Sequence, residues 1–404
     1  MTLFEDSWFF VYLAVALIPA LILGICEKPI KYYAFAVSLI FVWMATETNK
    51  RAMFFLIGFC IAEFIVLRVW LKVMKKYGRK SSFYVLFLAL GMAPLVISKL
   101  SNHFMGFNLL GFMGISYMTF KILQMIIEIY DELIEEVPAF DYFSFLLFFP
   151  SVLSGPIDRS QRYTKDLNTI PQRSDYMEMA GTGLVYKFVC ASLIYQILIW
   201  VNPQHGLMAD LIYMYAYGFY LFFDFAGYSR MAIGTAYLFG VKTPENFNAP
   251  FKSKDIMDFW DRWHITLSHW FRDYLFSRLM MRWIKNKRFS SRLTAAACGF
   301  MINMTVMGLW HGLDIFYIMY GIYHGALLAL TEIWNKKSKF RKKHKKDKGY
   351  IAVSTFITFN LVMFGLFIFS GKFTEILGLT PPGSSAVTAV GGDYFLKVMT
   401  KVLH

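Results

Sequence analysis

Cysteine is scarce in this sequence, and the motifs of several common protein classes are missing. The 404 residues include four cysteines, none in a CxxC pair, and all in or beside apolar runs: Cys26, Cys60, Cys190 and Cys298. At such positions cysteine packs as a small apolar residue, so we predict neither a disulfide framework nor a metal site. The chain also has no internal repeat and no glycine-rich phosphate loop of the Walker type.

We also expect no cleavable signal peptide. The first apolar run, Trp8–Cys26, follows Glu5 and Asp6 rather than basic residues, and no cleavage site with small residues comes after it. We therefore expect this run to stay in the membrane, with the N-terminus outside the cell.

Long apolar runs, in contrast, make up most of the chain. Hydrophobic residues form 57% of the sequence, compared with about 45–50% apolar residues in a soluble domain. The longest runs are Trp8–Cys26, Tyr32–Ala45, Ala52–Val73, Phe83–Ile97, Met179–Val201, Leu211–Phe225, Leu293–Trp310, Phe316–Ile333 and Ile351–Phe369. Because about 20 residues cross the hydrocarbon layer, we predict an all-α polytopic membrane protein with about eleven transmembrane helices.

Basic residues outnumber acidic ones, 41 to 27, and gather in three clusters. They are Lys72–Lys80, Arg262–Arg292 and the run "KKSKFRKKHKKDK" at 336–348, which holds nine Lys and Arg. Basic loops favour the cytoplasmic side, so we place all three there. The 336–348 run is interpreted as a solvated loop, or as a contact for an anionic inner leaflet or an acidic partner protein. We expect no nucleic-acid binding.

Two apolar stretches are interrupted. "FLLFFPSVLSGPIDRSQRYTKDL", residues 145–167, contains Pro150 and Gly155, and is predicted to be re-entrant or to lie near the cytoplasmic surface. "YLFFDFAGYSRMAIGTAYLFG", residues 220–240, places Asp224 and Ser229 among apolar residues, with Arg230 six residues after the Asp. Intramembrane ionisable residues usually face the protein interior, so Asp224 is a structural tie to Arg230 or backbone, or a substrate contact. A break at Gly227 would bring the pair together.

The stretch "FWDRWHITLSHWFRDYLFSRL", residues 259–279, is the most polar part of an apolar chain. If residues 257–276 form one helix, a polar stripe results, made of Arg262, Thr266, His269 and Asp273. His269 would then be wetted or salt-bridged next to Asp273. His264 falls instead on the face of Trp260, Leu267 and Phe271, flanked by Trp263. It would be a buried histidine, with Ser268 as its hydrogen-bond partner or as a substrate group.

A second histidine, His311, ends an apolar run in "MGLWHGLDIF", residues 307–316, directly after Trp310. An imidazole is a good general base near neutral pH. Gly308 and Gly312 leave backbone space around it. His324, one span later, is interpreted as a packing or polar-network residue.

Five segments resemble, in sequence and in order, the motifs of membrane-bound O-acyltransferases, the MBOAT family. They are "FFPSVLSGPIDR", "DFAGYSRMAIG", "NFNAPF", "FWDRWHITLSHWFRDYL" and "GLWHG", all between residues 145 and 325. In length, topology and motif order the resemblance covers nearly the whole chain. Within the family, the sequence is most similar to the branch that D-alanylates teichoic acid in Gram-positive bacteria.

The resemblance implies a fold, a location and an activity. The fold would be one domain, a ring of transmembrane helices with short or re-entrant helices around a central funnel, in the plasma membrane of a bacterium. Its parts would be N-terminal helices (1–135), a motif-bearing core (136–335), a basic cytoplasmic loop (336–348) and C-terminal helices (349–404). The enzyme would transfer D-alanine from a carrier-protein thioester toward teichoic acid hydroxyls.

Residue roles follow from the same resemblance. His311 matches the catalytic histidine of the family and His264 its second important histidine. The passage that admits the pantetheine arm would be lined by residues around them: Trp260, Trp263, Ser268, Phe271 and Trp310, with Asp224 and Ser229 as further candidates. The oxyanion would be stabilised by His264, Ser268 or backbone N–H groups near Gly312.

Partners and cofactors are implied as well. No cofactor would be bound permanently, because the carrier delivers the phosphopantetheine. An acidic D-alanyl carrier protein would dock on the cytoplasmic side. From charge density rather than from a motif, we expect Lys285, Lys287 and Arg288 to attract it, with an apolar contact near Trp260 and Phe271. The acceptor would be teichoic acid or an intermediary extracellular protein.

Two other functions stay open. One is O-acetylation of a cell-surface polysaccharide, as in the alginate-type branch of the same family. The other is a transporter without covalent chemistry, which would have charges along a path and repeat symmetry.

Overall fold

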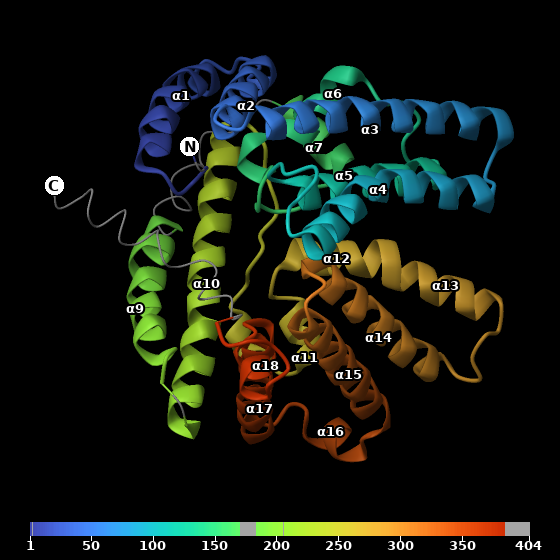
Figure 1. Cartoon of the computed structure of the whole chain (residues 1–404). Helices are drawn as coiled ribbons and strands as arrows, with labels where there is room; N and C mark the ends of the chain where they lie inside the picture. The colour runs from blue at the N-terminus through green and yellow to red at the C-terminus, as the bar shows by residue number, and fades with distance from the viewer. Residues whose placement is uncertain (2, 170–182, 205, 384–404) are drawn as a thin grey trace. The chain divides into compact units, whose positions relative to one another are not determined.

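The computed structural model describes residues 1, 3–169, 183–204 and 206–383, which form two compact units (Figure 1). One unit contains Met1–Gly183 and Tyr228–Glu245, and the other contains Leu184–Gly227 and Asn246–His404. In the described part of the chain all regular structure is helical, apart from one isolated bridge between Phe247 and Trp263. The all-α prediction is therefore confirmed. The predicted C-terminal helices lie partly outside the described residues.

The first unit consists of seven helices and the end of an eighth among its described residues. They are α1 (Ser7–Ile25), α2 (Lys31–Thr46), α3 (Lys50–Tyr77), α4 (Ser81–Met105), α5 (Ile115–Tyr130), α6 (Ala139–Leu147), α7 (Ser160–Leu167) and the last part of α10 (Leu207–Leu238). Helix α5 is buried on all sides from Met118 to Ile129. Its Lys121 donates to the carbonyl oxygen of Phe145 at 2.8 Å and to Oγ of Ser151 at 3.2 Å. This buried lysine ties α5 to the proline-interrupted segment.

That segment is broken, as predicted. Helix α6 stops at Leu147, a 3-10 turn covers Phe149–Ser151, and α7 starts only at Ser160. Phe149 packs in the aromatic core of the unit, with its ring 4.6 Å from that of Phe41. Whether the segment re-enters the membrane stays a prediction.

The second unit carries the remaining described helices. They are the π-helix η3 (Val185–Ala191), α9 (Ser192–Val201), the first part of α10, the 3-10 helix η4 (Pro250–Lys252), α11 (Ile256–Trp260), α12 (Ile265–Phe271), the π-helix η5 (Arg272–Phe276), α13 (Ser277–Lys285), α14 (Arg292–His311), α15 (Ile315–Lys337), α16 (Lys339–His344), α17 (Lys348–Phe369) and α18 (Lys372–Ile376). The predicted run Met179–Val201 begins outside the described residues.

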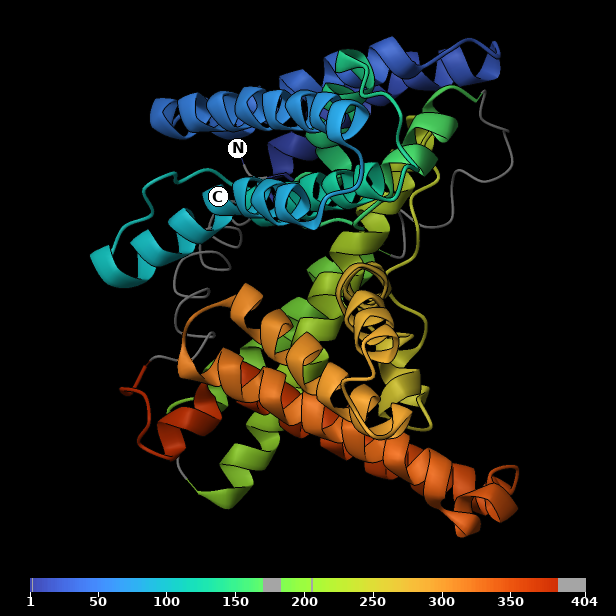
Figure 2. The same cartoon turned by 90° about the vertical axis from the view of Figure 1, so that its right-hand side faces the viewer.

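Helices α14 and α15 lie side by side along their length (Figures 1 and 2). Their contact is made through glycines. A Cβ added at Gly308 would lie 2.4 Å from the carbonyl oxygen of Tyr317, and one at Gly321 would lie 2.5 Å from that of Met304. Small residues let the backbones of membrane helices approach closely, so these glycines set the distance between the two helices.

The membrane prediction is supported by helix length and by surface composition. Five helices of the described chain are long and apolar enough to span a bilayer: α1, α3, α4, α14 and α17. Their outer faces expose large apolar side chains, such as Phe54 at 72% and Phe356 at 69%. Such a surface suits acyl chains rather than water. All nine predicted apolar runs coincide with helices where they are described, but the count of about eleven spans stays a prediction.

Candidate functional site

The stretch at 257–276 is not one helix, contrary to our prediction. Helix α11 ends at Trp260, and α12 starts only after His264, whose backbone is left-handed with φ 43° and ψ 52°. The break is imposed by an earlier segment. Ile265 N donates to the carbonyl oxygen of Asn246 at 3.0 Å, and Thr266 Oγ1 donates to Asn246 Oδ1 at 2.6 Å.

The same segment pairs with the other side of the break. Asn248 N donates to the carbonyl oxygen of Arg262 at 3.0 Å, and Phe247 and Trp263 form an antiparallel bridge. A left-handed residue with a side chain is unfavourable and persists only where its surroundings over-determine it, as they often do at functional sites. The tertiary bonds on both sides of His264 meet that condition.

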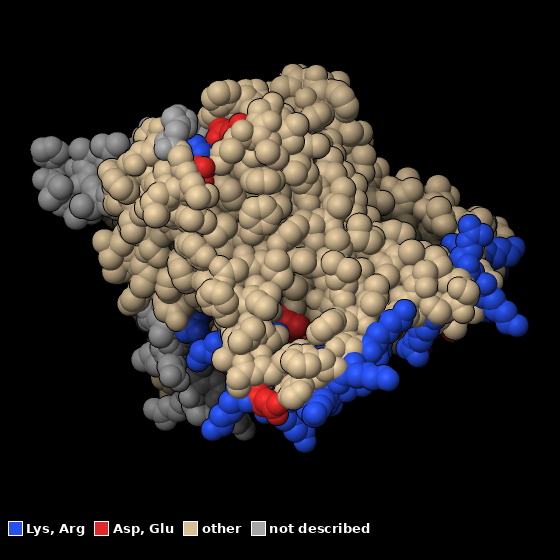
Figure 3. Space-filling view, turned by 90° about the horizontal axis from the view of Figure 1, so that it is seen from below, with Lys and Arg blue, Asp and Glu red and all other residues tan. Residues whose placement is uncertain are grey.

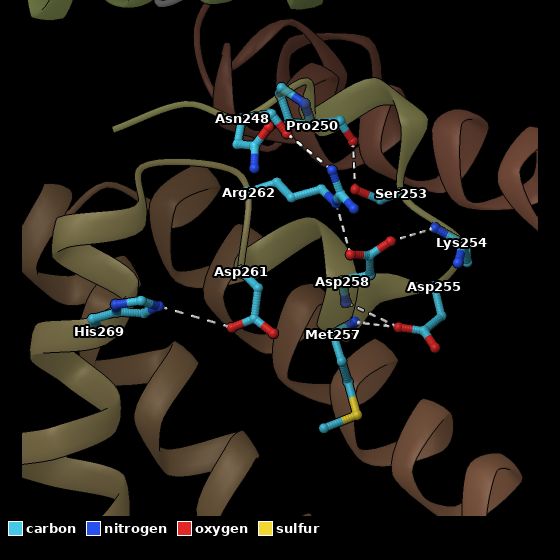
Figure 4. Close-up of polar contacts among 10 residues, drawn as sticks. All are labelled: Asn248, Pro250, Ser253, Lys254, Asp255, Met257, Asp258, Asp261, Arg262 and His269. Carbon is cyan, nitrogen blue, oxygen red and sulfur yellow. Dashed lines mark hydrogen bonds and ion pairs between the residues drawn. The ribbon is translucent and has the colours of Figure 1, made fainter. Parts of the chain in front are cut away.

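The predicted polar stripe is also wrong, because Thr266 is buried and bonded to Asn246. The charged groups form a local network around α11 instead (Figure 4). Arg262 Nε donates to Asp258 at 2.7 Å, and its Nη1 reaches the carbonyl oxygen of Asn248 at 3.3 Å. His269 lies with its Nε2 4.0 Å from Asp261. This network is partly exposed and links α11 to the residues of the turn.

His264 is buried, as predicted, with 4% of its surface exposed. Its ring meets that of Phe225 edge-on at 4.6 Å. Ser268 is not its partner, since the hydroxyl donates to the carbonyl oxygen of Trp263 at 3.2 Å. Among the described residues, Nε2 of His264 has no hydrogen-bond partner. Burial, and then the nearby His311, lower the pKa of His264 to about 3, so this imidazole is neutral.

His311 is the last residue of α14 and is partly exposed. Four aromatic rings surround its imidazole. Their centroids lie at 4.6 Å for Trp310, 6.0 Å for Tyr317, 6.2 Å for Tyr320 and 4.9 Å for Phe369. Sequence reasoning missed the last three. Tyr317 and Tyr320 share a helix face directly after "GLWHG", which was a usable signal, whereas nothing in the sequence pointed to Phe369.

His311 contributes, after burial, to the lowered pKa of His264, so the two predicted histidines are close enough to interact electrostatically. His311 follows Gly308 by three residues and precedes Gly312, whose N–H donates to the carbonyl oxygen of Gly308 at 3.2 Å. One histidine is held by a strained turn and the other by a helix end. The pair therefore combines a partly exposed imidazole with a buried neutral one.

A cavity of about 250 Å³ lies between α11, α12, η5, α14 and α15, and neither His264 nor His311 lines it. Trp260 and Ser268, two of the predicted passage residues, line it, together with Asn303 and Met307 of α14. Met307 is one turn before His311. Trp260 Nε1 and Asn303 Oδ1 are both buried and have no hydrogen-bond partner within the described part of the chain.

The other passage candidates are placed as follows. Trp263 and Phe271 are buried at 5% and 2% exposure and do not line the cavity, whereas Trp310 contacts His311. The apolar docking contact that we predicted from Trp260 and Phe271 is wrong, because both are buried at 7% and 2%.

Asp224 is tied by an ion pair, but not to Arg230. Its Oδ1 lies 2.6 Å from Nζ of Lys187 in η3. Helix α10 runs unbroken through Gly227, so the predicted break is wrong. Ser229 is buried at 1% exposure. The Lys187 partner is 37 residues away in sequence, and no local pattern could have identified it.

His324 packs rather than joining a polar network. It is fully buried, and neither ring nitrogen has a hydrogen-bond partner among the described residues. Its ring contacts Trp260 at 5.3 Å and Tyr320 at 4.7 Å. A Cβ added at Gly365 would lie 2.3 Å from His324 Nε2, so this glycine makes room for the ring.

Comparison with known proteins places this arrangement in a family context. The model of the membrane-bound O-acyltransferase family matches residues 202–370, which include both histidines. The teichoic acid D-alanyltransferase of Bacillus subtilis (strain 168) is 37% identical, over 92% of this chain and 98% of its own length. That of Streptococcus thermophilus is 36% identical, over 92% and 96%. The probable alginate O-acetylase AlgI of Pseudomonas aeruginosa is 31% identical over 71% of this chain, but over 52% of its own length.

Proposed function

The chain belongs to the membrane-bound O-acyltransferase family and is an acyltransferase, and from this premise we propose that it transfers D-alanine from a phosphopantetheinyl carrier protein toward teichoic acid, with His311 as general base. The observation that carries the proposal is the histidine pair. A partly exposed imidazole interacts with a buried neutral one, and a cavity with unpartnered polar groups is lined by Ser268 and Met307, each four residues from one of the two histidines. The names of the relatives that match nearly the full chain support D-alanine as the acyl group and teichoic acid as the acceptor.

The reaction needs one proton carrier. The acceptor oxygen attacks the thioester carbonyl carbon while His311 takes the hydroxyl proton. The carbon–sulfur bond then breaks, and the departing thiolate takes that proton from His311. In between, the imidazole is positively charged. Its place at the last residue of α14 suits this state, because the C-terminal end of a helix favours a cation.

The tetrahedral intermediate needs hydrogen-bond donors at its oxyanion. Of the three candidates, Ser268 donates to Trp263 and the Gly312 N–H donates to Gly308. His264 Nε2 has no partner among the described residues. We therefore assign the oxyanion contact to His264, as an Nε2–H donor. Its low pKa keeps the ring neutral, so it cannot compete with His311 for the proton.

The 250 Å³ cavity is the proposed end of the route for the pantetheine arm. That arm contains amide groups, each with one N–H donor and one carbonyl acceptor. Asn303 Oδ1 is an unpartnered acceptor and Trp260 Nε1 an unpartnered donor on the same cavity. An amide bound between them would satisfy both, and leaving such groups unpaired in a buried site costs about 1–3 kcal/mol each.

Carrier docking is assigned to α13 and the basic loop after it. Met281 and Ile284 are 62% and 51% exposed on this helix. They stand beside Lys285, Lys287 and Arg288, which are the charges predicted to attract an acidic carrier. An apolar patch next to basic residues offers both contact area and electrostatic steering. These exposed side chains replace the buried Trp260 and Phe271 as the apolar part of the surface.

The test is a transfer assay with the full chain in lipid vesicles. A carrier protein charged with labelled D-alanine is supplied on one side, and label on teichoic acid is measured, with a carrier charged with acetate in parallel. We expect D-alanyl transfer by the native chain and by His269→Ala, but not by a normally inserted His311→Ala. Active His311→Ala would disprove the base. Transfer of acetate alone would instead support the polysaccharide O-acetylation branch.

The immediate acceptor can be separated in the same system. Label that appears on teichoic acid with only the charged carrier and this chain present would indicate direct transfer. Label that appears only after an extracellular protein is added would indicate a relay.

A further inference from the structure

A second cavity of the same unit, of about 950 Å³, lies away from the histidine pair. It is enclosed by the end of α15, by α16, by the first half of α17 and by the segment Lys254–Asp258. None of the residues assigned to the transfer reaction lines it. Its volume is at the upper end of the range for ligand pockets, which is roughly 300–1,000 Å³.

One wall of this cavity is apolar, and several of its side chains are also exposed at the surface. Leu330 and Trp334 of α15 are 63% and 50% exposed, and Val353 and Ile357 of α17 are 60% and 52% exposed. Helix α17 is one of the membrane-spanning candidates. A molecule in the cavity could therefore extend along these side chains into the acyl-chain region.

The opposite rim is cationic. Helix α16 starts at the Ser338 cap, whose side chain accepts from Arg341 N, and presents Arg341 and Lys345 to the cavity. Lys254 adds a third positive charge from the neighbouring segment. Lys254 and Lys345 have no ion-pair partner in the described part of the chain. Figure 3 shows that Lys and Arg side chains gather in a band on one face of the molecule, with few carboxylates among them.

Three carboxylates line the cavity too, but each is engaged. Asp258 binds Arg262 at 2.7 Å, and Asp347 lies 2.6 Å from His344. Asp255 accepts from two backbone N–H groups at the start of α11 and lies 3.6 Å from Arg341. With Asp258 paired to Arg262, the charges of Lys254, Arg341 and Lys345 exceed those of Asp255 and Asp347 even when His344 is uncharged, so the net charge at the rim is positive.

We propose that this cavity binds an anionic phospholipid, with the phosphate at Lys254, Arg341 and Lys345 and an acyl chain along Leu330 and Ile357. A free phosphate would use the rim but leave the apolar wall uncovered. An acidic protein would be attracted by the whole basic run and not by this pocket in particular. Only an amphiphilic anion uses both halves of the site.

The experiment compares two double substitutions that remove the same charge. Lys254→Gln with Lys345→Gln changes the cavity rim, whereas Lys342→Gln with Lys346→Gln changes the same basic run outside the cavity. The full chain is purified in detergent, and retained lipid is measured by native mass spectrometry after titration with phosphatidylglycerol or phosphatidylcholine. Inorganic phosphate is added as a competitor in a further arm.

We expect the rim variant to lose at least about tenfold in apparent affinity for phosphatidylglycerol and the control variant to lose less than about threefold. Phosphatidylcholine should bind weakly to all, and millimolar phosphate should not displace phosphatidylglycerol. Equal losses in the two variants would overturn the proposal in favour of a diffuse basic surface. Displacement by phosphate would overturn it in favour of a free anion site. Unchanged lipid binding with weakened docking of the charged carrier would overturn it in favour of an acidic protein. Thermal stability without lipid, measured for each variant and for Lys345→Gln alone, checks that the fold is kept.

Discussion

Gly321→Ala should slow acyl transfer although Gly321 touches neither histidine. The new Cβ would lie 2.5 Å from the carbonyl oxygen of Met304 and 3.0 Å from Cα of Thr305, both backbone atoms of α14. Heavy atoms in contact stay about 3.5 Å apart, so α14 and α15 must separate by about 1 Å. His311 ends α14, while Tyr317 and Tyr320 hold its ring from α15.

The magnitudes separate stability from function. Overpacking costs about 1–3 kcal/mol, and the better helix propensity of Ala offsets about 1 kcal/mol of it. The net loss of stability is therefore modest, about 0–2 kcal/mol. A misplacement of about 1 Å at the reacting groups, however, can cost about 100-fold in rate. The expected result is a folded protein with a rate reduced 10- to 100-fold.

Gly58→Ala is the matched control. Gly58 lies in the spanning helix α3, and a Cβ there meets nothing within 4 Å. Transfer rate and thermal unfolding in the same vesicles would be measured for both variants. If Gly321→Ala were as active as Gly58→Ala, the spacing of α14 and α15 would not determine the position of His311, and the reasoning would fail.

Four other predictions concern individual side chains or pairs of them. His264→Ala should lose most of the transfer activity at normal insertion and His269→Ala little, because only the first is buried beside His311; equal loss in the same assay would contradict the assignment. The pKa of His264 is lower in the folded chain than its ordinary value of about 6.5; the unfolded chain therefore takes up the proton first, and stability should fall as pH drops from about 6.5 toward 3. His264→Asn, which tolerates the left-handed backbone, should flatten that part of a curve of melting temperature against pH, and an unchanged slope would exclude His264 as its source. Asn303→Leu should raise the KM for the charged carrier about tenfold, and an unchanged KM would contradict the proposed route of the pantetheine arm. Charge reversal of Lys285 and Arg288 should slow carrier association and weaken its salt dependence. An unchanged association rate would contradict the proposed docking surface.

The helices were predictable where one physical signal dominates. Runs such as Ala52–Val73 and Ile351–Phe369 are long and apolar, and they coincide with α3 and α17. The interruption after Leu147 was also predictable, because proline and glycine oppose helix continuation locally.

The break at His264 was not predictable from local sequence. Residues 257–276 contain no proline or glycine, and their pattern suits a helix. The turn is fixed by hydrogen bonds that Asn246 accepts from Ile265 and Thr266 and by one that Asn248 donates to Arg262, and these bonds compete with helical bonds across the break. For the same reason, the proximity of His264 and His311 could be inferred only through family resemblance. The Lys187–Asp224 pair and the contact of Phe369 with His311 also depend on long-range packing.

The left-handed turn has a consequence for the order in which the site is made during translation. Asn246 leaves the ribosome before His264, so the partner that fixes the turn is already present when the turn is synthesised. His311 follows 47 residues later, which at about 5–20 residues per second takes several seconds. During that interval the turn at His264 is present without His311, and the glycine contact of α15 with α14 does not yet exist. On the proposed assignment of His311 as the base, a nascent chain is inactive until the helix that carries His311 has been made and packed.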